Sequence, residues 1–102
     1  MKDKLLQIIN RYGIEHQQRK LEEEVFELQQ AITLFETSTT KYNIEEELAD
    51  VMVMLKQFQH YFDIKDEEIE KVMKFKVDRQ LERIANDTNN NIWCYLSSIQ
   101  DR

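Results

Sequence analysis

The sequence Leu21-Glu22-Glu23-Glu24-Val25-Phe26-Glu27-Leu28 sets apolar residues at helical spacing among acidic ones. The apolar pattern starts after Gly13 and continues in steps of three and four to Phe35, and it predicts a helix that begins at Ile14. The polar stretch 36–43 predicts a loop after it. A helix with one apolar face needs a neighbour to cover that face.

A second segment repeats this pattern 23 residues later. Asn43 and Glu46 have the spacing of a capping box and predict the start of the next helix. Its apolar seam is formed by Ile44, Leu48, Val51, Leu55, Phe58 and Phe62. The first five of these residues align with the seam of the first segment, which is formed by Leu21, Val25, Leu28, Ile32 and Phe35. The same offset places Glu24 on Glu47 and Glu27 on Asp50.

Two further helices flank this pair. A short one runs from about Leu5 to Tyr12, and Gly13, the only glycine, is expected as its left-handed C-terminal cap. A fourth begins at Asp63 or Asp66 and runs to about residue 85, where the Asn-rich stretch 86–91 is expected to break it. The tail 92–102 is expected to be a short helix that docks on the core or on another subunit.

Glycine occurs once and proline never, which all but excludes a β or α/β fold. The predicted fold class is therefore all-α: an antiparallel helical bundle of four main helices with a short C-terminal segment, completed by oligomerisation. The 102 residues are expected to form a single domain, with a core at about 10–85 and a docking segment at 86–102.

The charge and hydropathy of the chain exclude several classes of partner. Its net charge of -6 argues against a protein that coats a nucleic acid polymer or an anionic membrane. The longest apolar run, Val51 to Leu55, cannot span a bilayer, so no membrane is expected as a partner. We expect a cytoplasmic protein in which the single cysteine, Cys94, is a packing residue.

The repeated acid pairs predict a cation site. At about 100° per residue, Glu24 and Glu47 lie about 60° from the centre of their seams, and Glu27 and Asp50 about 120°, all on one side. Acidic residues on facing helices would repel each other, and a hard divalent cation such as Mg²⁺ or Mn²⁺ would remove that repulsion. The absence of thiolate and imidazole from the cluster argues against zinc. A solvated helix face is the alternative explanation of each acidic run alone.

The fourth helix carries the opposite charge. The face that begins with Ile69 and Val72 continues into Lys76, Arg79 and Arg83, which need an anionic partner. That partner is either the acidic cluster or a substrate phosphate. His16 and His60 lie on different helices without a second histidine at ligand spacing, so we expect surface or rim positions for them.

These segments resemble the MazG-like all-α nucleoside triphosphate pyrophosphohydrolases over about residues 10–85. The matching features are a Gln and a Lys before EExxE (Glu23 to Glu27), then ExxD (Glu47 to Asp50), then Lys76-Val77-Asp78-Arg79. The resemblance implies an oligomeric bundle that uses Mg²⁺, with Mn²⁺ as a substitute, to cleave an NTP or dNTP into the monophosphate and pyrophosphate.

The resemblance also implies roles for individual residues. The implied metal ligands are Glu24, Glu27, Glu47 and Asp50. Glu23 would be a ligand of a second metal or would orient the attacking water. The phosphates would be held by Lys20, Lys76, Arg79 and Arg83.

Three other functions compete with this one. A phosphoribosyl-ATP pyrophosphohydrolase of related fold is the nearest. A di-iron carboxylate bundle normally requires Glu-x-x-His pairs, and here both second positions are acids, Glu27 and Asp50. The third is a non-enzymatic helical interaction module with a solvated acidic face, which would bind Mg²⁺ too weakly to be stabilised by it.

Apolar residues outside the seams predict a homodimer or homotetramer. They are Phe26, Leu34, Val53 and Met54. A chain of this length cannot enclose both sides of two long helices, so a second copy is expected to cover them. The segment around Trp93 of a neighbouring chain could then complete a pocket for the base.

Overall fold

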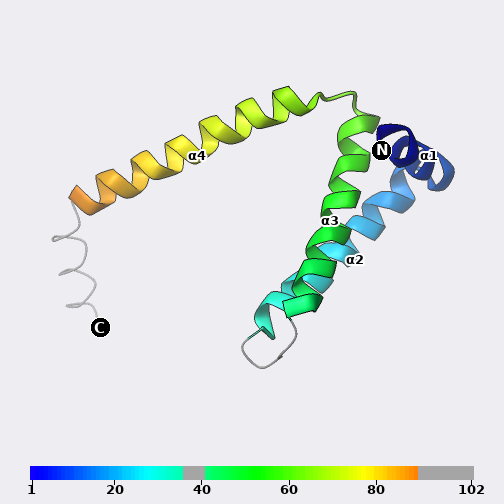
Figure 1. The fold of residues 1–102 in the computed structure, drawn as a ribbon, viewed down its shortest axis with the longest axis horizontal. Helices are drawn as coiled ribbons and strands as arrows, with labels where there is room; N and C mark the ends of the chain where they lie inside the picture. The colour runs from blue at the N-terminus through cyan, green and yellow to red at the C-terminus, as the bar shows by residue number, and fades with distance from the viewer. Residues whose placement is uncertain (36–40, 90–102) are drawn as a thin grey trace. The chain divides into compact units, whose positions relative to one another are not determined.

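The computed structural model describes residues 1–35 and 41–89, apart from the side chains of residues 41, 42, 88 and 89. Four helices follow one another: α1 (Lys2–Tyr12), α2 (Ile14–Thr33), α3 (Lys41–Tyr61) and α4 (Asp66–Asn89) (Figure 1). Within those ranges there is no strand, which confirms the all-α prediction. The predicted tail helix, including Trp93 and Cys94, and most of the predicted loop lie outside the described residues.

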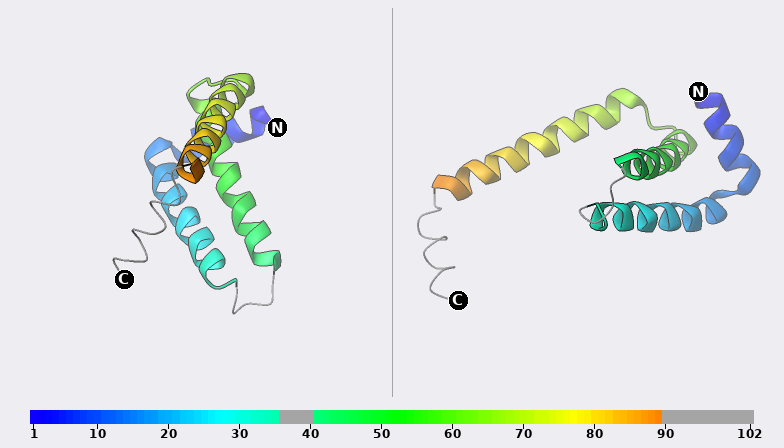
Figure 2. Two further views of the ribbon diagram at one scale, coloured as in Figure 1. Left: turned by 90° about the vertical axis from the view of Figure 1, so that its left-hand side faces the viewer. Right: turned by 60° about the horizontal axis from the view of Figure 1, so that its bottom comes forward.

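The chain divides into two compact units, Met1–Lys65 and Asp66–Arg102, and each is described by itself. In the first unit α2 packs against α3, and α1 packs against both of them. Figure 2 shows α2 and α3 side by side with opposite directions, with α1 across one end of the pair. A hydrogen bond between the side chains of Gln17 and Gln57 fixes the antiparallel register near that end.

Gly13 alone joins α1 to α2. Its N–H donates to the carbonyl of Ile9 (2.8 Å), and its own carbonyl accepts from the N–H of Gln17 (3.1 Å), so it ends one helix and starts the next. Its φ of 90° is positive, as expected, but its ψ of 153° is not that of the left-handed helical cap that the sequence predicts. This extended, positive-φ conformation is almost confined to glycine.

The core of the first unit is small and contains polar side chains. Its buried apolar residues are Leu5, Ile9, Val51 and Met54, and its buried polar residues are Gln17, Glu24, Gln57 and Gln59. Met54 lies outside the predicted seam and is expected to need cover from a second copy, but it is already buried within the chain because α1 packs on this side of α3. The interface is therefore rotated towards the acidic side of both helices.

This rotation leaves the other side of the predicted seams uncovered within the chain. Ile32 of α2 and Leu48 and Leu55 of α3 are exposed, although the sequence predicts them as core. Val25 and Met52 are exposed as well. α1 has only eleven residues and covers one side of the hairpin, so the opposite side keeps a row of exposed apolar side chains.

Two predicted helix boundaries are wrong. α3 begins at Lys41, so Asn43 lies inside the helix and does not cap it. α4 continues to Asn89, so residues 86–89 do not break it. The helix penalty of Asn is only about 0.7 kcal/mol per residue relative to Ala, which a long helix tolerates.

α3 ends in a Schellman motif. The N–H of Asp63 donates to the carbonyl of His60 (3.1 Å), and the N–H of Ile64 donates to that of Gln59 (3.0 Å). Asp63 takes the left-handed conformation, with φ of 56°, that glycine more often occupies at this position. The side chain of Gln59 also donates to the carbonyl of Ile64 (3.0 Å), which holds the end of α3 closed.

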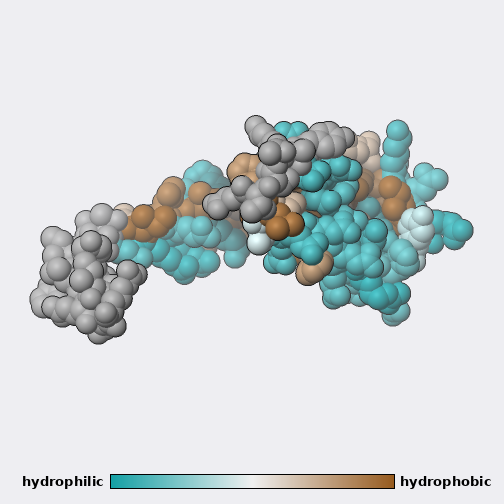
Figure 3. Space-filling view, turned by 90° about the horizontal axis from the view of Figure 1, so that it is seen from below, coloured by the Kyte–Doolittle hydropathy of each residue, from teal (hydrophilic) through white to brown (hydrophobic). Residues whose placement is uncertain are grey.

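In α4, in the second unit, every residue from 66 to 87 except Ile69 is exposed. Figure 3 shows apolar side chains along one side of this helix and hydrophilic ones along the other. The exposed apolar residues are Val72, Met73, Phe75, Val77, Leu81 and Ile84. The guanidinium of Arg79 lies 5.6 Å from the centre of the Phe75 ring. Among the described helices, none combines the length and the apolar content needed to cross a membrane.

The conformation of Gly13 predicts the effect of replacing it. A Cβ there would meet no atom within 4 Å, so Gly13→Ala tests backbone strain without a steric clash. We expect the variant to lose about 1–3 kcal/mol of the free energy of unfolding, because alanine is strained at this φ and ψ. Urea unfolding followed by circular dichroism measures the loss. A variant as stable as the parent would contradict this account of the connection.

Candidate functional site

Three of the predicted acidic residues come together in the first unit. Glu24 and Glu27 of α2 and Glu47 of α3 each offer a carboxylate oxygen, and these three oxygens lie within 4.8 Å of one another. Glu24 and Glu27 are neighbours on α2 because they are three residues apart, and the antiparallel register brings Glu47 opposite them. We refer to these three residues as the acidic triad.

Two oxygens of the triad are buried without a partner. Glu24 is 8% exposed, and Glu47 is half-buried. The Oε2 atoms of both residues are inaccessible to solvent and have no hydrogen-bond partner. Leaving a carboxylate oxygen in this state costs free energy, and native proteins rarely do so without a compensating ligand or charge.

The environment of Glu47 favours its neutral form. Burial raises the pKa of the Glu47 carboxyl above its ordinary value of 4.5, and the negative charges of Glu27 and Asp50 raise it further. A hydrogen bond with Glu27 also raises this pKa, and the charge of Glu24 contributes least. The triad therefore holds negative charge that the protein only partly neutralises.

Lys20 supplies part of the missing positive charge. Its Nζ lies 3.3 Å from Oε1 of Glu24 and 3.5 Å from Oε2 of Glu23. The hydrogen bond to Glu24 and its charge raise the pKa of Lys20, and Glu23 adds to the effect. The Lys20 side chain is 45% exposed, so it also borders solvent beside the triad.

Asp50 and Glu23 lie outside the triad. Asp50 is exposed on α3, and its charge acts on Glu47. Glu23 is exposed on α2 and contacts Lys20. The predicted roles of both residues stay predictions.

The three basic residues predicted to bind phosphate from the fourth helix all lie on α4. Lys76, Arg79 and Arg83 are exposed there, on the second unit. They share a side of α4 because they are spaced by three and four residues.

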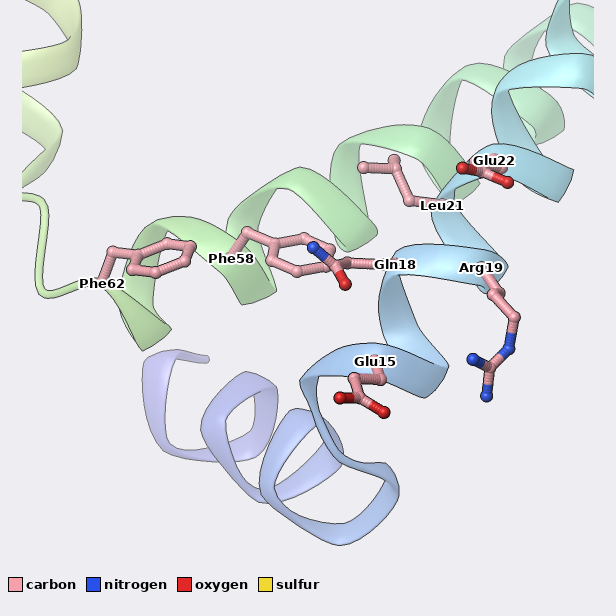
Figure 4. A pocket seen from close by; sticks show the side chains of 7 residues that line it. All are labelled: Glu15, Gln18, Arg19, Leu21, Glu22, Phe58 and Phe62. Atoms are coloured by element: carbon pink, nitrogen blue, oxygen red, sulfur yellow. The ribbon is translucent and has the colours of Figure 1, made fainter.

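Two pockets open on opposite sides of α2. One, of about 710 Å³, lies between Leu21 of α2 and the rings of Phe58 on α3 and Phe62 just after it, with charged side chains at its rim (Figure 4). This pocket is on the side of α2 away from the triad. The other, of about 590 Å³, is lined by residues of α1, α2 and α3, including Lys20 and Glu23. It therefore adjoins the triad.

The second pocket contains functional candidates that the sequence analysis missed. Gln17 and Gln57 are 3% and 2% exposed, and the Nε2 of Gln17 donates to the Oε1 of Gln57 (2.8 Å). Gln17 lies four residues before Leu21, at a seam position where an apolar residue is expected. The polar side chain at this seam position is the feature by which the sequence could have identified Gln17. Gln57 lies away from the predicted seam, and the sequence gives no comparable signal for it.

The triad fits a hard divalent cation. Oxygens on opposite sides of an octahedral Mg²⁺ are about 4.2 Å apart and neighbouring ones about 3 Å, so three oxygens within 4.8 Å of one another would have to draw together to share one ion. An all-carboxylate donor set suits Mg²⁺ or Mn²⁺ and not zinc. The two buried, unpartnered oxygens are the atoms that would gain most from such an ion.

Comparison with protein families, with curated proteins and with solved structures finds no match for this chain.

The raised pKa of Glu47 predicts how stability depends on pH. The folded protein holds this proton more tightly than the unfolded chain does, so the stabilisation is complete below about pH 4.5 and is lost as the pH rises through the raised pKa. In EDTA we expect Glu47→Gln, which cannot ionise, to lose less stability over this range than the parent. Thermal melts from about pH 4 to about pH 8 measure the difference.

Glu22→Gln is the matched control, because Glu22 is an exposed acid on the opposite side of α2. It should follow the parent at every pH. Parallel curves for the parent and Glu47→Gln would show that Glu47 is not strained by its neighbours.

Proposed function

We propose that the protein is a Mg²⁺-dependent nucleoside triphosphate pyrophosphohydrolase, which hydrolyses an NTP or dNTP to the monophosphate and pyrophosphate. The observation that carries the proposal is the pair of buried, unpartnered carboxylate oxygens on Glu24 and Glu47, within the triad formed with Glu27. The proposal also draws on the resemblance of EExxE and ExxD to the MazG-like enzymes, whose implied ligands include these three residues.

The proposed metal ligands are the triad and Asp50. Asp50 is exposed on α3 and three residues after Glu47, so a rotamer change would bring it towards the same ion. When bound, Mg²⁺ supplies positive charge that offsets the triad and the phosphate oxygens of the substrate. This charge is the main requirement, because phosphoryl transfer depends on positioning and charge neutralisation.

The other charged residues act on the substrate and the water. Lys20 is held beside the triad by Glu24 and donates to a phosphate oxygen from there. Glu23 is exposed next to it and orients a solvent water. It accepts a proton of this water as the water oxygen bonds to the α or β phosphorus and the bond from that phosphorus to the oxygen bridging the two breaks. The resemblance to the MazG-like enzymes assigns the remaining phosphate contacts to Lys76, Arg79 and Arg83, which all lie on α4.

Two alternatives give different results in one assay. A phosphoribosyl-ATP pyrophosphohydrolase would act on phosphoribosyl-ATP and not on ordinary triphosphates. A non-enzymatic interaction module would release no pyrophosphate from either and would not be stabilised by Mg²⁺. The buried oxygens of the triad favour an enzyme over the module, because a solvated acidic face would leave no carboxylate oxygen inaccessible and unpartnered.

The proposal predicts that each ligand is essential. With Mg²⁺ and a panel of nucleoside triphosphates, we expect Glu24→Gln, Glu27→Gln, Glu47→Gln and Asp50→Asn each to lower pyrophosphate release by at least about 100-fold, since losing even an outer partner of a metal ligand typically costs about 10- to 100-fold. Mg²⁺ should raise the melting temperature of the parent and not that of Glu47→Gln.

The control is again Glu22→Gln, which should retain activity and Mg²⁺ stabilisation. Full activity in any two of the four ligand variants would refute the assignment. Orthophosphate as the only product would refute cleavage between the α and β phosphates.

We also propose that two or more chains complete the helical bundle. The apolar residues expected outside the seams include Phe26, Leu34 and Val53, and all three are exposed in the single chain. The uncovered side of α2 and α3 also exposes Ile32, Leu48 and Leu55, which likewise need to be covered. Covering each large side chain contributes about 1.5–3 kcal/mol, so the free chain is expected to associate.

Sedimentation equilibrium at micromolar concentration tests this. We expect a dimer or tetramer of the 12.4 kDa chain. Leu48→Glu together with Leu55→Glu should shift the equilibrium towards the monomer, because it places charges on the uncovered face. A folded, active species of one chain would refute the proposal.

A further inference from the structure

The pocket of about 590 Å³ beside the triad has the composition of a site for a flat heteroaromatic ring. One wall is aromatic: the rings of Tyr12 and His16 stack with their centres 5.0 Å apart and their planes 16° from parallel. Ile8 and the buried Met54 add apolar surface. Aromatic side chains stack on nucleobases of any kind, because every base has a flat π-face.

The floor of the pocket is a buried pair of amides. The Nδ1 of His16 donates to the Oε1 of Gln17 (2.8 Å), since an amide oxygen can only accept. The Nε2 of Gln17 then donates to the Oε1 of Gln57 (2.8 Å). The chain of hydrogen bonds therefore runs in one direction, from His16 to Gln57.

This chain ends in a donor without a good acceptor. The Nε2 of Gln57 lies 3.8 Å from the sulfur of Met54, and a thioether is a weak acceptor. No oxygen acceptor for it is recorded among the described residues, although Gln57 is 2% exposed. A buried amide N–H without a strong acceptor destabilises the protein. A hydrogen bond to a ligand carbonyl would remove that cost.

The pocket is also placed correctly for a nucleotide. Lys20 lines it and pairs with Glu24 of the triad (3.3 Å). Gln17 precedes Glu24 by two turns of α2, about 10 Å along the helix. A nucleotide with phosphates at the triad would reach the pocket past Lys20.

We propose that this pocket is the base subsite of the enzyme, in which the Nε2 of Gln57 donates a hydrogen bond to a nucleobase carbonyl while the base stacks on the aromatic pair formed by Tyr12 and His16. The inference rests on the proposed function and adds the class of base. The oxygens of Gln17 and Gln57 each already accept one hydrogen bond, so the group on the floor that most lacks a partner is the donor Nε2 of Gln57. It therefore favours uracil, thymine or guanine over adenine, which presents an amino group and no carbonyl.

The test is binding of UMP and AMP to the full chain in EDTA, which needs neither Mg²⁺ nor hydrolysis. Both ligands carry the same sugar and phosphate, so the difference reports the base. We expect UMP to bind roughly three- to tenfold more tightly than AMP, the effect of about one hydrogen bond. In NMR spectra, UMP should shift the side-chain amide signals of Gln17 and Gln57.

Two variants test the aromatic wall and the amide floor of the pocket, and a third is their control. Tyr12→Leu should weaken UMP binding at least about fivefold through lost stacking. Phe62→Leu is the control, because Phe62 is as exposed as Tyr12 (58% each) and lines the pocket on the other side of α2. Gln17→Leu with Gln57→Leu leaves no unpaired amide and should abolish the preference for UMP over AMP.

The outcomes separate this inference from the proposed function. UMP that does not shift the two glutamines, binding unaffected by Tyr12→Leu, or AMP that binds as tightly as UMP would each overturn the base subsite, even if the protein hydrolyses triphosphates. UMP binding as expected without any pyrophosphate release would support the subsite and refute the pyrophosphohydrolase. If the double glutamine variant does not fold, Tyr12→Leu and the NMR shifts still decide.

Discussion

The rest of the first unit depends on the placement of carboxylates inside a helix interface. Glu24 is buried between α2 and α3, and Glu47 lies opposite it with a raised pKa. A helical hairpin of this size would be more stable with apolar residues at these positions, because buried carboxylates lose hydration and repel each other. Lys20 offsets part of this cost through its contact with Glu24. The uncompensated remainder is the physical reason to expect a cation.

The small helix α1 determines which side of the hairpin is buried. Leu5 and Ile9 of α1 belong to the core together with Val51 and Met54 of α3. By packing across one end of the hairpin (Figure 2), α1 covers the part of this side that holds Gln17, Gln57 and Met54, and it leaves the opposite side exposed. One side of the hairpin thus carries buried polar groups, while the other carries exposed apolar side chains. The first suits a small charged ligand, and the second suits another protein chain.

The Gln17–Gln57 pair and the acidic triad both result from the antiparallel packing of α2 against α3. Gln17 pairs with Gln57 near one end, and Glu24 and Glu27 meet Glu47 about two turns further along α2. Lys20 lies between them and contacts the triad while it lines the pocket. A ligand that carries anionic groups at one end and a flat polar ring at the other matches this order, and nucleotides are the common metabolites with that chemistry.

The sequence by itself determined the four helices and the acid pairs, because helical periodicity and the i, i+3 spacing of acids are local properties of the chain. It also predicted the positive φ of Gly13, which only glycine adopts readily. Only the tertiary structure decided how far α2 and α3 are rotated about their axes. Sequence periodicity places the acids beside the core, but the contact of α1 moves the interface onto Glu24, buries Met54 and exposes Leu48. The hydrogen bond between Gln17 and Gln57 likewise joins residues forty positions apart, and no local pattern encodes such a contact.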